Sequence, residues 1–444
     1  MNQLTPGYAR VGRPVGVIHF GLGAFHRGHQ AVYFDEALEK GSGEWGIYGI
    51  SPRSTLVTDL LRKQDFCYTV NARAGSEQNP RVISSIFDGS IFDLTNAELG
   101  KAVHSPELKL ITVTVTEKAY QVSNELDSMP NRLLDILHLR FVAGLSGPTV
   151  ISCDNLPSNG SRLAEVLLAS AERRGMTSHF RSWLSEQSFP DSMVDRIVPA
   201  ITSDAVSQFE RDFGYRDESL ISTEPYRQWV VAPHVGSDAL ARLGIDVSPE
   251  ISRYETLKLR LFNGAHSTTA YFSQLSGIEY VYQAMAIPEW NSFISGLQEE
   301  LGASFEGPRA IDSQRYGADA RARIGNSAMA HRSAQIAMDG SAKLPQRLFR
   351  AMNSLSERGL ARERIAFAVA LWIRFLQSAN SVVDPLASEL LIRARVAKPA
   401  DAVAGVMRTP GLLDAISEPD WPLIAGALKE LSEATPLAVA MRIE

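Results

Sequence analysis

The sequence predicts an α/β protein with two domains, the first containing a mostly parallel sheet and the second mainly α-helical. Three observations predict this class. Short β-rich runs alternate with helical patterns in the first half of the chain, a glycine-rich turn follows the first run, and β-rich runs disappear after about Pro249. Such alternation favours a parallel sheet covered by helices. The 444 residues exceed what one ordinary core holds, so we expect domains at 1–249 and 250–444.

The strand candidates of the first half are short runs rich in β-branched and aromatic residues. Several are apolar enough to be buried on both faces, as strands of a parallel sheet are. They span 15–21, 45–51, 66–71, 81–87, 110–116 and 149–154. Helical patterns separate several of them, at 28–40, 55–63, 131–141 and 161–174.

The second half carries long helical patterns. The expected boundary lies near 245–252, after the turn-rich segment 236–238. Apolar residues then recur with helical spacing, which predicts an α-helical domain. The predicted helices span 255–276, 345–356, 364–379, 385–397 and 422–432.

The first strand runs directly into a glycine turn and then a helix. Gly21 and Gly23 match the first two glycines of the Rossmann-type dinucleotide-binding fingerprint, whereas His26 stands at the third position. Glycines there let the backbone approach a pyrophosphate at the helix N-terminus. A tight turn also needs glycine for steric reasons alone. Its place after the first strand, with the basic Arg27 following, favours the dinucleotide site.

The end of the second strand bears on the choice of cofactor. An acidic side chain there holds the ribose hydroxyls of NAD and repels the 2′-phosphate of NADP. The segment 49–54 has no carboxylate, and its Arg53 and Ser54 are able to bind a phosphate, although a loop arginine is commonly just solvated. The predicted cofactor is therefore NAD or NADP.

A lysine, a carboxamide and an imidazole fall within one helical stretch of the second half. At about 100° per residue, Lys258, Glu255, His266 and Asn263 share an arc of about 140°. Leucines and other apolar residues fill most of the opposite side, so the polar arc is able to line a cleft. The alternative is a solvated Lys–Glu pair, which contributes little to stability. On this stretch alone both readings stand.

Two further polar stretches end strands where ligands of open α/β sheets bind, at the carboxyl edge. One is the segment 116–118, and the other, 152–157, contains Asn155. A carboxamide at a strand end is able to donate to a developing oxyanion. Asp-Asn near a proline is also ordinary turn chemistry. Spacing alone does not decide between the two.

Composition excludes several classes. Apolar residues make up 45% and charged residues 21%, and the net charge is −6 without long blocks of one sign, which argues against nucleic-acid and membrane-surface binding. No segment reads as a signal peptide or a membrane span, so we expect a cytoplasmic protein. Cys67 and Cys153 lie in strand-like runs typical of buried thiols, and the histidines show no zinc-site spacing, so no metal is expected.

Together, these stretches resemble the mannitol dehydrogenase family of polyol-specific long-chain dehydrogenases and reductases, which includes fructuronate reductase (mannonate oxidoreductase). The family's Lys-x4-Asn-x2-His signature is met by Lys258, Asn263 and His266. Six collinear segments carry the resemblance, and they span most of the chain. They are 18–29, 116–118, 152–157, 189–199, 258–266 and 338–347.

The resemblance implies a Rossmann domain, a helical substrate domain with the active site between them, and a metal-independent hydride transfer. It makes Lys258 the general acid/base, Asn155 and Asn263 the oxyanion donors, and His266 a substrate-orienting partner. Glu255 stands where a carboxylate helps to move the proton to solvent. Free lysine, with a pKa near 10.4, is a poor base, so partial burial has to lower its pKa.

The resemblance also implies residues that bind the cofactor and the substrate. Lys343 is expected to contact substrate, and Arg347 and Arg227 are further candidates to meet a substrate carboxylate. Two residues, Asp195 and Arg196, are expected near the nicotinamide. Gly21, Gly23, Phe25 and Arg27 are expected along the dinucleotide. Arg53 is a candidate for its adenosine end because of its place after the second strand, where this sequence lacks the acidic residue of NAD-preferring mannitol dehydrogenases.

The segments 335–347 and 222–230 look more like the fructuronate reductase branch than like polyol oxidisers. The predicted reaction therefore interconverts fructuronate and mannonate or fructose and mannitol, as a monomer or a small homo-oligomer. Arabinitol-type and altronate/tagaturonate-type substrates are alternatives within the same chemistry. The alternative from another class is a catalytically silent NAD(P)-binding regulatory protein. The joint presence of Lys258, Asn263, His266 and Asn155 argues against it.

Overall fold

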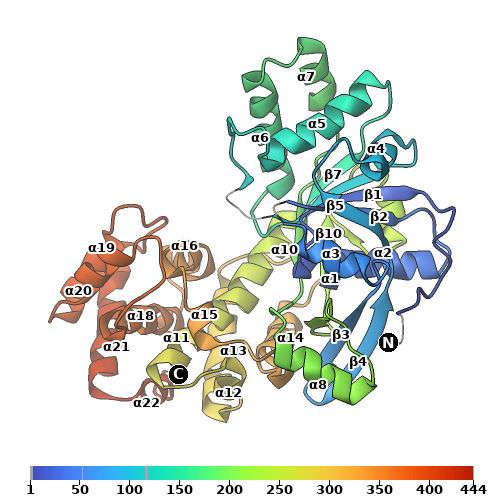
Figure 1. Cartoon of the computed structure of the whole chain (residues 1–444). Helices are drawn as coiled ribbons and strands as arrows, with labels where there is room; N and C mark the ends of the chain where they lie inside the picture. The colour runs from blue at the N-terminus through green and yellow to red at the C-terminus, as the bar shows by residue number, and fades with distance from the viewer. Residues whose placement is uncertain (1–3, 53, 116–118, 444) are drawn as a thin grey trace. The chain divides into compact units, whose positions relative to one another are not determined.

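The computed structural model describes residues 4–52, 54–115 and 119–443. The chain divides into two compact units, Met1–Ser252 and Arg253–Glu444. The first contains a parallel sheet with helices on both faces, and the second is helical, which confirms the predicted fold class (Figure 1). Among the described residues, no helix combines the length and the apolar character needed to cross a bilayer.

The central sheet of the first unit has five parallel strands in the order β5-β2-β1-β6-β7. The chain order therefore reverses beside β1, and the crevice at the carboxyl ends of strands on either side of such a point is where open α/β sheets bind ligands. The strands are β1 Val15–Phe20, β2 Gly46–Ser51, β5 Ile86–Ile91, β6 Leu110–Val113 and β7 Thr149–Ser152.

Successive residues of these strands enter two different cores. On β1, Val17 belongs to the core on the α2 side, whereas Ile18 belongs to the core under α4 to α7 (Figure 1). This alternation follows from the two-residue period of a strand. The helices of this unit are α1 Ala24–Gly28, α2 Gln30–Glu39, α3 Leu56–Arg62, α4 Ala97–His104, α5 Met129–Val142, α6 Asn159–Arg173, α7 Ser178–Ser185, α8 Ser203–Phe213 and α9 Ser237–Ala241.

Two predicted strands do not form the central sheet as expected. The run 66–71 contributes to β3, which pairs with β4 and β9 in a separate sheet. The run 81–87 is split between β4 and β5 at Ser84 and Ser85, which bond to the Asp35 carboxylate and the Ala31 carbonyl. The smaller sheets contain β3 Tyr68–Ala74, β4 Glu77–Ile83 and β9 Ile221–Thr223, and β8 Ser192–Asp195, β10 Gln228–Val231 and β11 Asp246–Val247.

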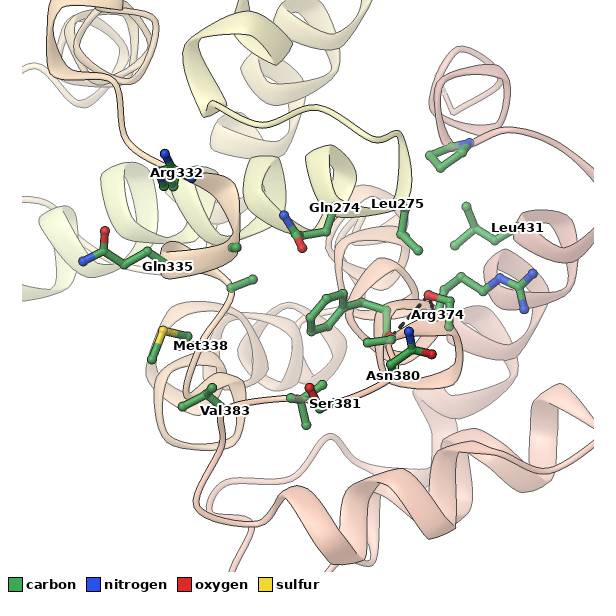
Figure 2. Close-up of a pocket in the computed structure, with 17 residues that line it drawn as sticks. Gln274, Leu275, Arg332, Gln335, Met338, Arg374, Asn380, Ser381, Val383 and Leu431 are labelled. Carbon is green, nitrogen blue, oxygen red and sulfur yellow. Dashed lines mark hydrogen bonds between the residues drawn. The ribbon is translucent and has the colours of Figure 1, made fainter.

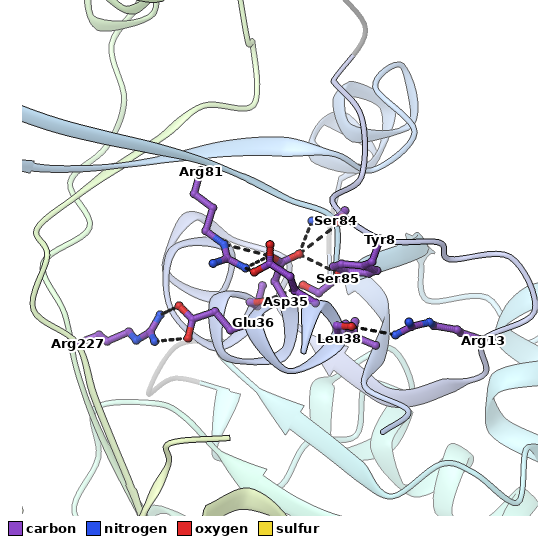
Figure 3. Close-up of polar contacts among 11 residues, drawn as sticks. Tyr8, Arg13, Asp35, Glu36, Leu38, Arg81, Ser84, Ser85 and Arg227 are labelled. Atoms are coloured by element: carbon purple, nitrogen blue, oxygen red, sulfur yellow. Dashed lines mark hydrogen bonds and ion pairs between the residues drawn. The ribbon is translucent and has the colours of Figure 1, made fainter. Parts of the chain in front are cut away.

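Carboxylates on α2 bond to segments of the smaller sheets and to residues near them (Figure 3). Asp35 is buried and accepts hydrogen bonds from Tyr8 Oη at 2.9 Å, Arg81 Nη2 at 2.7 Å and the Ser84 backbone N–H at 2.8 Å. Its neighbour Glu36 binds both terminal nitrogens of Arg227, at 2.7 and 2.6 Å. These pairs hold β4 and the start of β10 against α2.

The second unit is built around α18, whose residues 365–373 are all buried, and this helix packs against α11, α13 and α21. The unit contains several helices that the sequence patterns missed, among them α13, α14 and α20. Its elements are α10 Ile251–Leu257, η2 Lys258–Gly264, α11 Ala265–Leu275, α12 Val281–Met285, α13 Pro288–Ala303, α14 Ser313–Ile324, η3 Ser327–Met329, α15 Ser333–Ile336, α16 Gly340–Leu344, η4 Pro345–Phe349, α17 Arg350–Glu357, α18 Glu363–Ser378, α19 Ala387–Ala394, α20 Pro399–Met407, η5 Glu418–Asp420, α21 Trp421–Glu433 and α22 Pro436–Ala440.

Candidate active site

A cavity of about 630 Å³ opens at the carboxyl ends of β1, β2 and β6. Its position beside the reversal of strand order is where a Rossmann-type sheet binds a dinucleotide, and its volume lies within the usual range for ligand sites. The lining comes from the end of β1 and the turn after it, from the end of β2 and described residues that follow it, from described residues after β6, and from the start of α5. It comprises Phe20, Gly21, Leu22, Gly23, Ser51, Pro52, Val57, Thr114, Val115, Ala119, Gln121, Val122, Ser123, Glu125, Asp127, Ser128, Met129 and Arg132.

Gly21 is the position in this turn that requires glycine. Its φ is +98°, and a Cβ atom placed on it would lie 1.7 Å from the Thr114 carbonyl oxygen. Gly23 is exposed, and the nearest atom to a Cβ there would be 3.8 Å away. Because Gly21 has no side chain, the turn packs closely against Thr114 at the end of β6. Gly23 adds no side chain to the cavity wall.

The other predicted cofactor residues of this segment lie beside the lining. Phe25 stacks on the His29 ring, with centroids 5.1 Å apart. Arg27 donates to the Ser219 carbonyl at 3.0 Å and lies 5.7 Å from the Tyr68 ring. Arg53 lies outside the described residues. A contact between any of these three and a cofactor stays a prediction.

Asp195 and Arg196 lie at the end of β8, and both are buried. The Arg196 guanidinium donates to the Gly28 carbonyl at 2.5 Å and to the Glu224 carbonyl at 3.1 and 2.9 Å. Gly28 is the last residue of α1, so Arg196 binds the C-terminal end of that helix. These bonds give Arg196 a structural role in addition to the cofactor contact predicted for it.

Asn155 follows β7 and is exposed. The preceding Asp154 carboxylate accepts hydrogen bonds from the Val115 N–H at 2.9 Å and Tyr120 Oη at 2.5 Å. Asp154 thereby joins the ends of β6 and β7 next to the cavity, and Asn155 lies at the predicted sheet edge. The segment 116–118 lies outside the described residues.

In the second unit, the Lys258–Gly264 stretch forms a π-helical turn, η2, between α10 and α11. The prediction of one continuous α-helix over 255–276 is therefore wrong here. Residues five apart stack in a π-turn, which brings Lys258 and Asn263 to successive turns of one face. The π-turn lies where α13, α14 and η4 pack against it. No local sequence pattern encodes these contacts.

The predicted polar arc is buried. Lys258, Asn263 and His266 are each 8% exposed, and residues 261–273 are buried throughout, so the helix is enclosed and not amphipathic at a surface. A solvated Lys258 side chain is thereby excluded. Asn263 Nδ2 and His266 Nε2 are buried and find no hydrogen-bond partner among the described residues. Unpaired buried polar atoms are costly, and such donors are typical of a site that bonds a ligand.

His266 lies in a cationic neighbourhood. Its ring stacks on that of His331, with centroids 5.5 Å apart. Burial, followed by the charges of His331, Arg347, Arg323 and Lys343, holds the pKa of His266 well below its ordinary value. The imidazole is therefore neutral at physiological pH, with one nitrogen able to donate and the other to accept.

The remaining predicted residues of this unit lie on α10, α16 and η4. Glu255 is half-buried on α10. Lys343 Nζ donates to the Met338 carbonyl at 2.7 Å and lies 3.9 Å from Asp339. Arg347 is partly buried, donates to Ser267 Oγ at 2.7 Å, and contacts the Asn263 carbonyl at 3.5 Å. The structure thus brings Arg347 to Asn263 on η2 and to Ser267, the residue after His266, on α11.

A second cavity, of about 880 Å³, lies in the helical unit near the C-terminal ends of α11 and α18 (Figure 2). Its walls include Gln274, Arg332, Arg374 and Asn380. Met338 also lines it, and the carbonyl of this residue accepts the Lys343 hydrogen bond. This cavity therefore adjoins the segment that carries a predicted substrate residue.

No sequence pattern pointed to His331, Arg323 or the cavity residues Thr114, Met129 and Arg132. His331 precedes a short helix and had no motif around it. Arg323 lies on α14 with its guanidinium carbon 4.1 Å from the Phe262 ring, a contact across sixty residues that no local pattern reveals. In the part of the chain that the structure describes, no group of three His, Cys, Asp or Glu side chains is placed to hold a metal ion.

Family models match both units. The model of the mannitol dehydrogenase Rossmann domain matches residues 15–240, and that of the mannitol dehydrogenase C-terminal domain matches residues 250–417. An uncharacterised oxidoreductase of Escherichia coli (strain K12) is 32% identical, covering 87% of this chain and 85% of its own. The D-mannonate oxidoreductase of the same strain is 30% identical, and the match covers 89% of this chain and 88% of that protein.

A solved structure is also similar to this chain. It is that of the Pseudomonas fluorescens mannitol 2-dehydrogenase in a ternary complex with NAD and D-mannitol. It is 26% identical, with a TM-score of 0.81, and the match covers 98% of this chain and 95% of that one. The Rossmann-type sheet, the Lys-x4-Asn-x2-His motif and the two family models agree, and the chain belongs to the mannitol dehydrogenase family of oxidoreductases.

Proposed function

We propose that this protein is an NAD(P)-dependent dehydrogenase that interconverts a keto-uronate and the corresponding aldonate, as in the fructuronate/mannonate pair. Membership of the family makes the protein a polyol or sugar-acid dehydrogenase. The choice of a sugar acid over a neutral ketose and polyol such as fructose and mannitol is our proposal.

The Arg347 guanidinium is the observation that carries this choice. Desolvation lowers its pKa to about 10, and it has no carboxylate partner among the described residues. Its guanidinium donates to one hydroxyl and one carbonyl, and its other N–H groups are able to bind a ligand. A desolvated charge without a counter-charge is unfavourable. A substrate carboxylate supplies that counter-charge with matching bidentate geometry.

The other cationic candidates fit this role less well. Arg227 is already neutralised by a bidentate pair with Glu36. The Lys343 ammonium donates to a carbonyl and lies near Asp339, so part of its hydrogen-bonding capacity is used. We therefore assign the carboxylate to Arg347 and a substrate hydroxyl to Lys343.

The chain's own residues supply the proton chemistry. We assign to Lys258 the removal of the hydroxyl proton in oxidation and its return in reduction. Asn155 and the unpaired Asn263 Nδ2 donate to the substrate oxygen as its charge develops. The neutral His266 bonds a neighbouring hydroxyl, and Glu255 passes the proton to solvent.

The cofactor we propose is NAD or NADP, held in the cavity at the carboxyl ends of β1, β2 and β6. This proposal is supported by Gly23, which lines the cavity without a side chain, and by the approach of Gly21 to β6, where a Cβ atom would collide with Thr114. The nicotinamide ring supplies the hydride acceptor or donor. In the described part of the segment after β2 there is no carboxylate, so both dinucleotides stay candidates.

The test is NADH and NADPH oxidation by the purified protein with fructuronate, tagaturonate and fructose. We expect kcat/KM for a keto-uronate to exceed that for fructose by about a hundredfold, as a charge-paired substrate should. Lys258→Ala should lower kcat by about 10²- to 10⁴-fold. The dissociation constant for the dinucleotide should stay unchanged in that variant.

Three results would contradict the proposal. Equal or better turnover of fructose would assign the protein to neutral ketoses, and retained turnover in Lys258→Ala would remove the lysine from the mechanism. Tight dinucleotide binding without oxidation by any of these substrates, or by an arabinitol-derived ketose, would favour the silent regulatory alternative.

A further inference from the structure

A buried histidine on β1 supports the glycine turn from the sheet side. The His19 imidazole is fully buried, with Nδ1 2.7 Å from Thr112 Oγ1. Its Nε2 lies 2.8 Å from Thr114 Oγ1 and 3.0 Å from the Gly21 carbonyl oxygen. Thr112 is on β6 and Thr114 follows its end. One ring therefore connects the turn after β1 to the end of the neighbouring strand.

The hydrogen-bond roles in this network follow from its acceptor. The Gly21 carbonyl only accepts, so Nε2 carries the hydrogen, and Nδ1 accepts from the Thr112 hydroxyl. The Thr114 hydroxyl donates to the same carbonyl at 2.9 Å. A neutral imidazole provides this one donor and one acceptor, and burial lowers the pKa of His19 to about 3, so the ring is neutral at physiological pH.

Three donors converge on the Gly21 carbonyl. The third is the Gly23 backbone N–H, at 2.6 Å. A carbonyl oxygen offers two lone pairs, so His19 and Thr114 satisfy it without Gly23. Gly23 is exposed and lines the cavity, and its N–H is able to exchange this acceptor for a ligand oxygen.

We propose that His19 is a positioning residue for the dinucleotide. Together with Thr114 it keeps the Gly21 carbonyl bonded on the sheet side of the turn. The Gly23 N–H is then released to donate to a pyrophosphate oxygen, at no cost to the Gly21 carbonyl. His19 itself touches neither cofactor nor substrate. The inference rests on the proposed function, since it requires that the cavity bind a dinucleotide.

The experiment compares His19→Ala, His19→Gln and Thr112→Val. NADH and NADPH dissociation constants are measured by fluorescence, and KM and kcat by steady-state kinetics. His19→Ala should weaken dinucleotide binding and raise its KM by about tenfold, the effect of one lost hydrogen bond, while kcat at saturation falls less. His19→Gln, which keeps a donor and an acceptor, should recover most of the affinity.

Leu167→Ala on α6 serves as the matched control, because it opens the buried core of the same unit without contacting the turn. It should lower stability and leave the dissociation constant unchanged. Thr112→Val tests the network if His19→Ala does not fold, since it removes only the donor to Nδ1. If folded His19→Ala or Thr112→Val binds the dinucleotide with wild-type affinity, the role of His19 is overturned, whereas the proposed function is not. A wild-type protein that binds neither dinucleotide would overturn the proposed function.

Discussion

Whether an arginine of this protein is available to a ligand depends on its neighbours. Arg227 and Arg347 are similar in sequence context, yet Glu36 binds Arg227 with two hydrogen bonds, whereas Arg347 contacts a hydroxyl and a carbonyl. A paired guanidinium has little to gain from a substrate carboxylate. A desolvated one without a counter-charge gains much, because its burial is otherwise uncompensated.

Replacing Arg347 by methionine should change substrate preference. With a keto-uronate, kcat/KM should fall by about 10²- to 10³-fold, the usual effect of removing one partner of a desolvated charge pair. With a neutral ketose the decrease should be small, because no carboxylate is present. Steady-state kinetics of wild type and variant give the ratio of kcat/KM for the two substrates, and this ratio tests the role of Arg347.

The matched control for this prediction is Arg227→Met, which removes an arginine that an acid already neutralises. That variant should lose stability through the unpaired Glu36 but keep the wild-type ratio of the two substrates. If Arg347→Met lowers turnover of both substrates equally, Arg347 has a structural role and the carboxylate is bound elsewhere.

Among the helices of the second unit, close packing determines local geometry more than sequence pattern does. The η2 turn departs from α-helical bonding where three other elements enclose it. A similar constraint acts on α16, which carries Lys343. A Cβ atom on Gly340 would lie 2.5 Å from Trp372 Nε1 and 2.6 Å from Tyr271 Oη, both on fully buried rings.

Gly340→Ala should therefore destabilise the protein by about 1–3 kcal/mol, the cost of overpacking a rigid site. The added methyl group should also displace α16 and raise the KM for the sugar substrate through Lys343. Urea unfolding and steady-state kinetics on the same preparation measure the two effects.

Gly302→Ala provides the comparison, because Gly302 lies inside α13 with no atom within 4 Å of a Cβ atom placed on it. Alanine there should be neutral or stabilising by up to about 1 kcal/mol, through higher helix propensity. Equal stability of the two alanine variants would contradict overpacking at Gly340.

The whole molecule should be sensitive to acid because its first unit buries neutral histidines. Burial lowers the pKa of His19 and that of His29 to about 3, from an ordinary value of 6.5. Below pH 6.5 the unfolded chain binds protons that the folded chain excludes. The contribution of these histidines to the free energy of unfolding is therefore fully present above pH 6.5 and is lost as the pH falls towards 3.

At pH 5 the loss should be on the order of 2 kcal/mol per buried histidine relative to pH 7. Hydrogen exchange of the β1 and α2 amides at both pH values, corrected for intrinsic rates, measures it. In His29→Gln, the difference in unfolding free energy between pH 7 and pH 5 should shrink by that amount. In His104→Gln the same difference should persist, because His104 is exposed. An unchanged difference in His29→Gln would refute the histidine explanation.

The sequence by itself determined the alternation of strands and helices in the first half and the helical character of the second half. It also determined the glycine turn at Gly21 and Gly23 and the joint presence of Lys258, Asn263 and His266. These features depend on periodicity and spacing within one stretch, so a single chain displays them. The family relationship followed from the same local motifs.

Only the tertiary structure decided which residues meet across the chain. In the structure, the run 66–71 lies in a separate sheet and Lys258–Gly264 forms a π-turn. Arg227 pairs with Glu36, 191 residues away. The fold also leaves Arg347 with no acid partner among the described residues. The physical reason is that burial, charge pairing and strand registration depend on contacts between distant segments, and such contacts leave no periodic trace in the sequence around either partner.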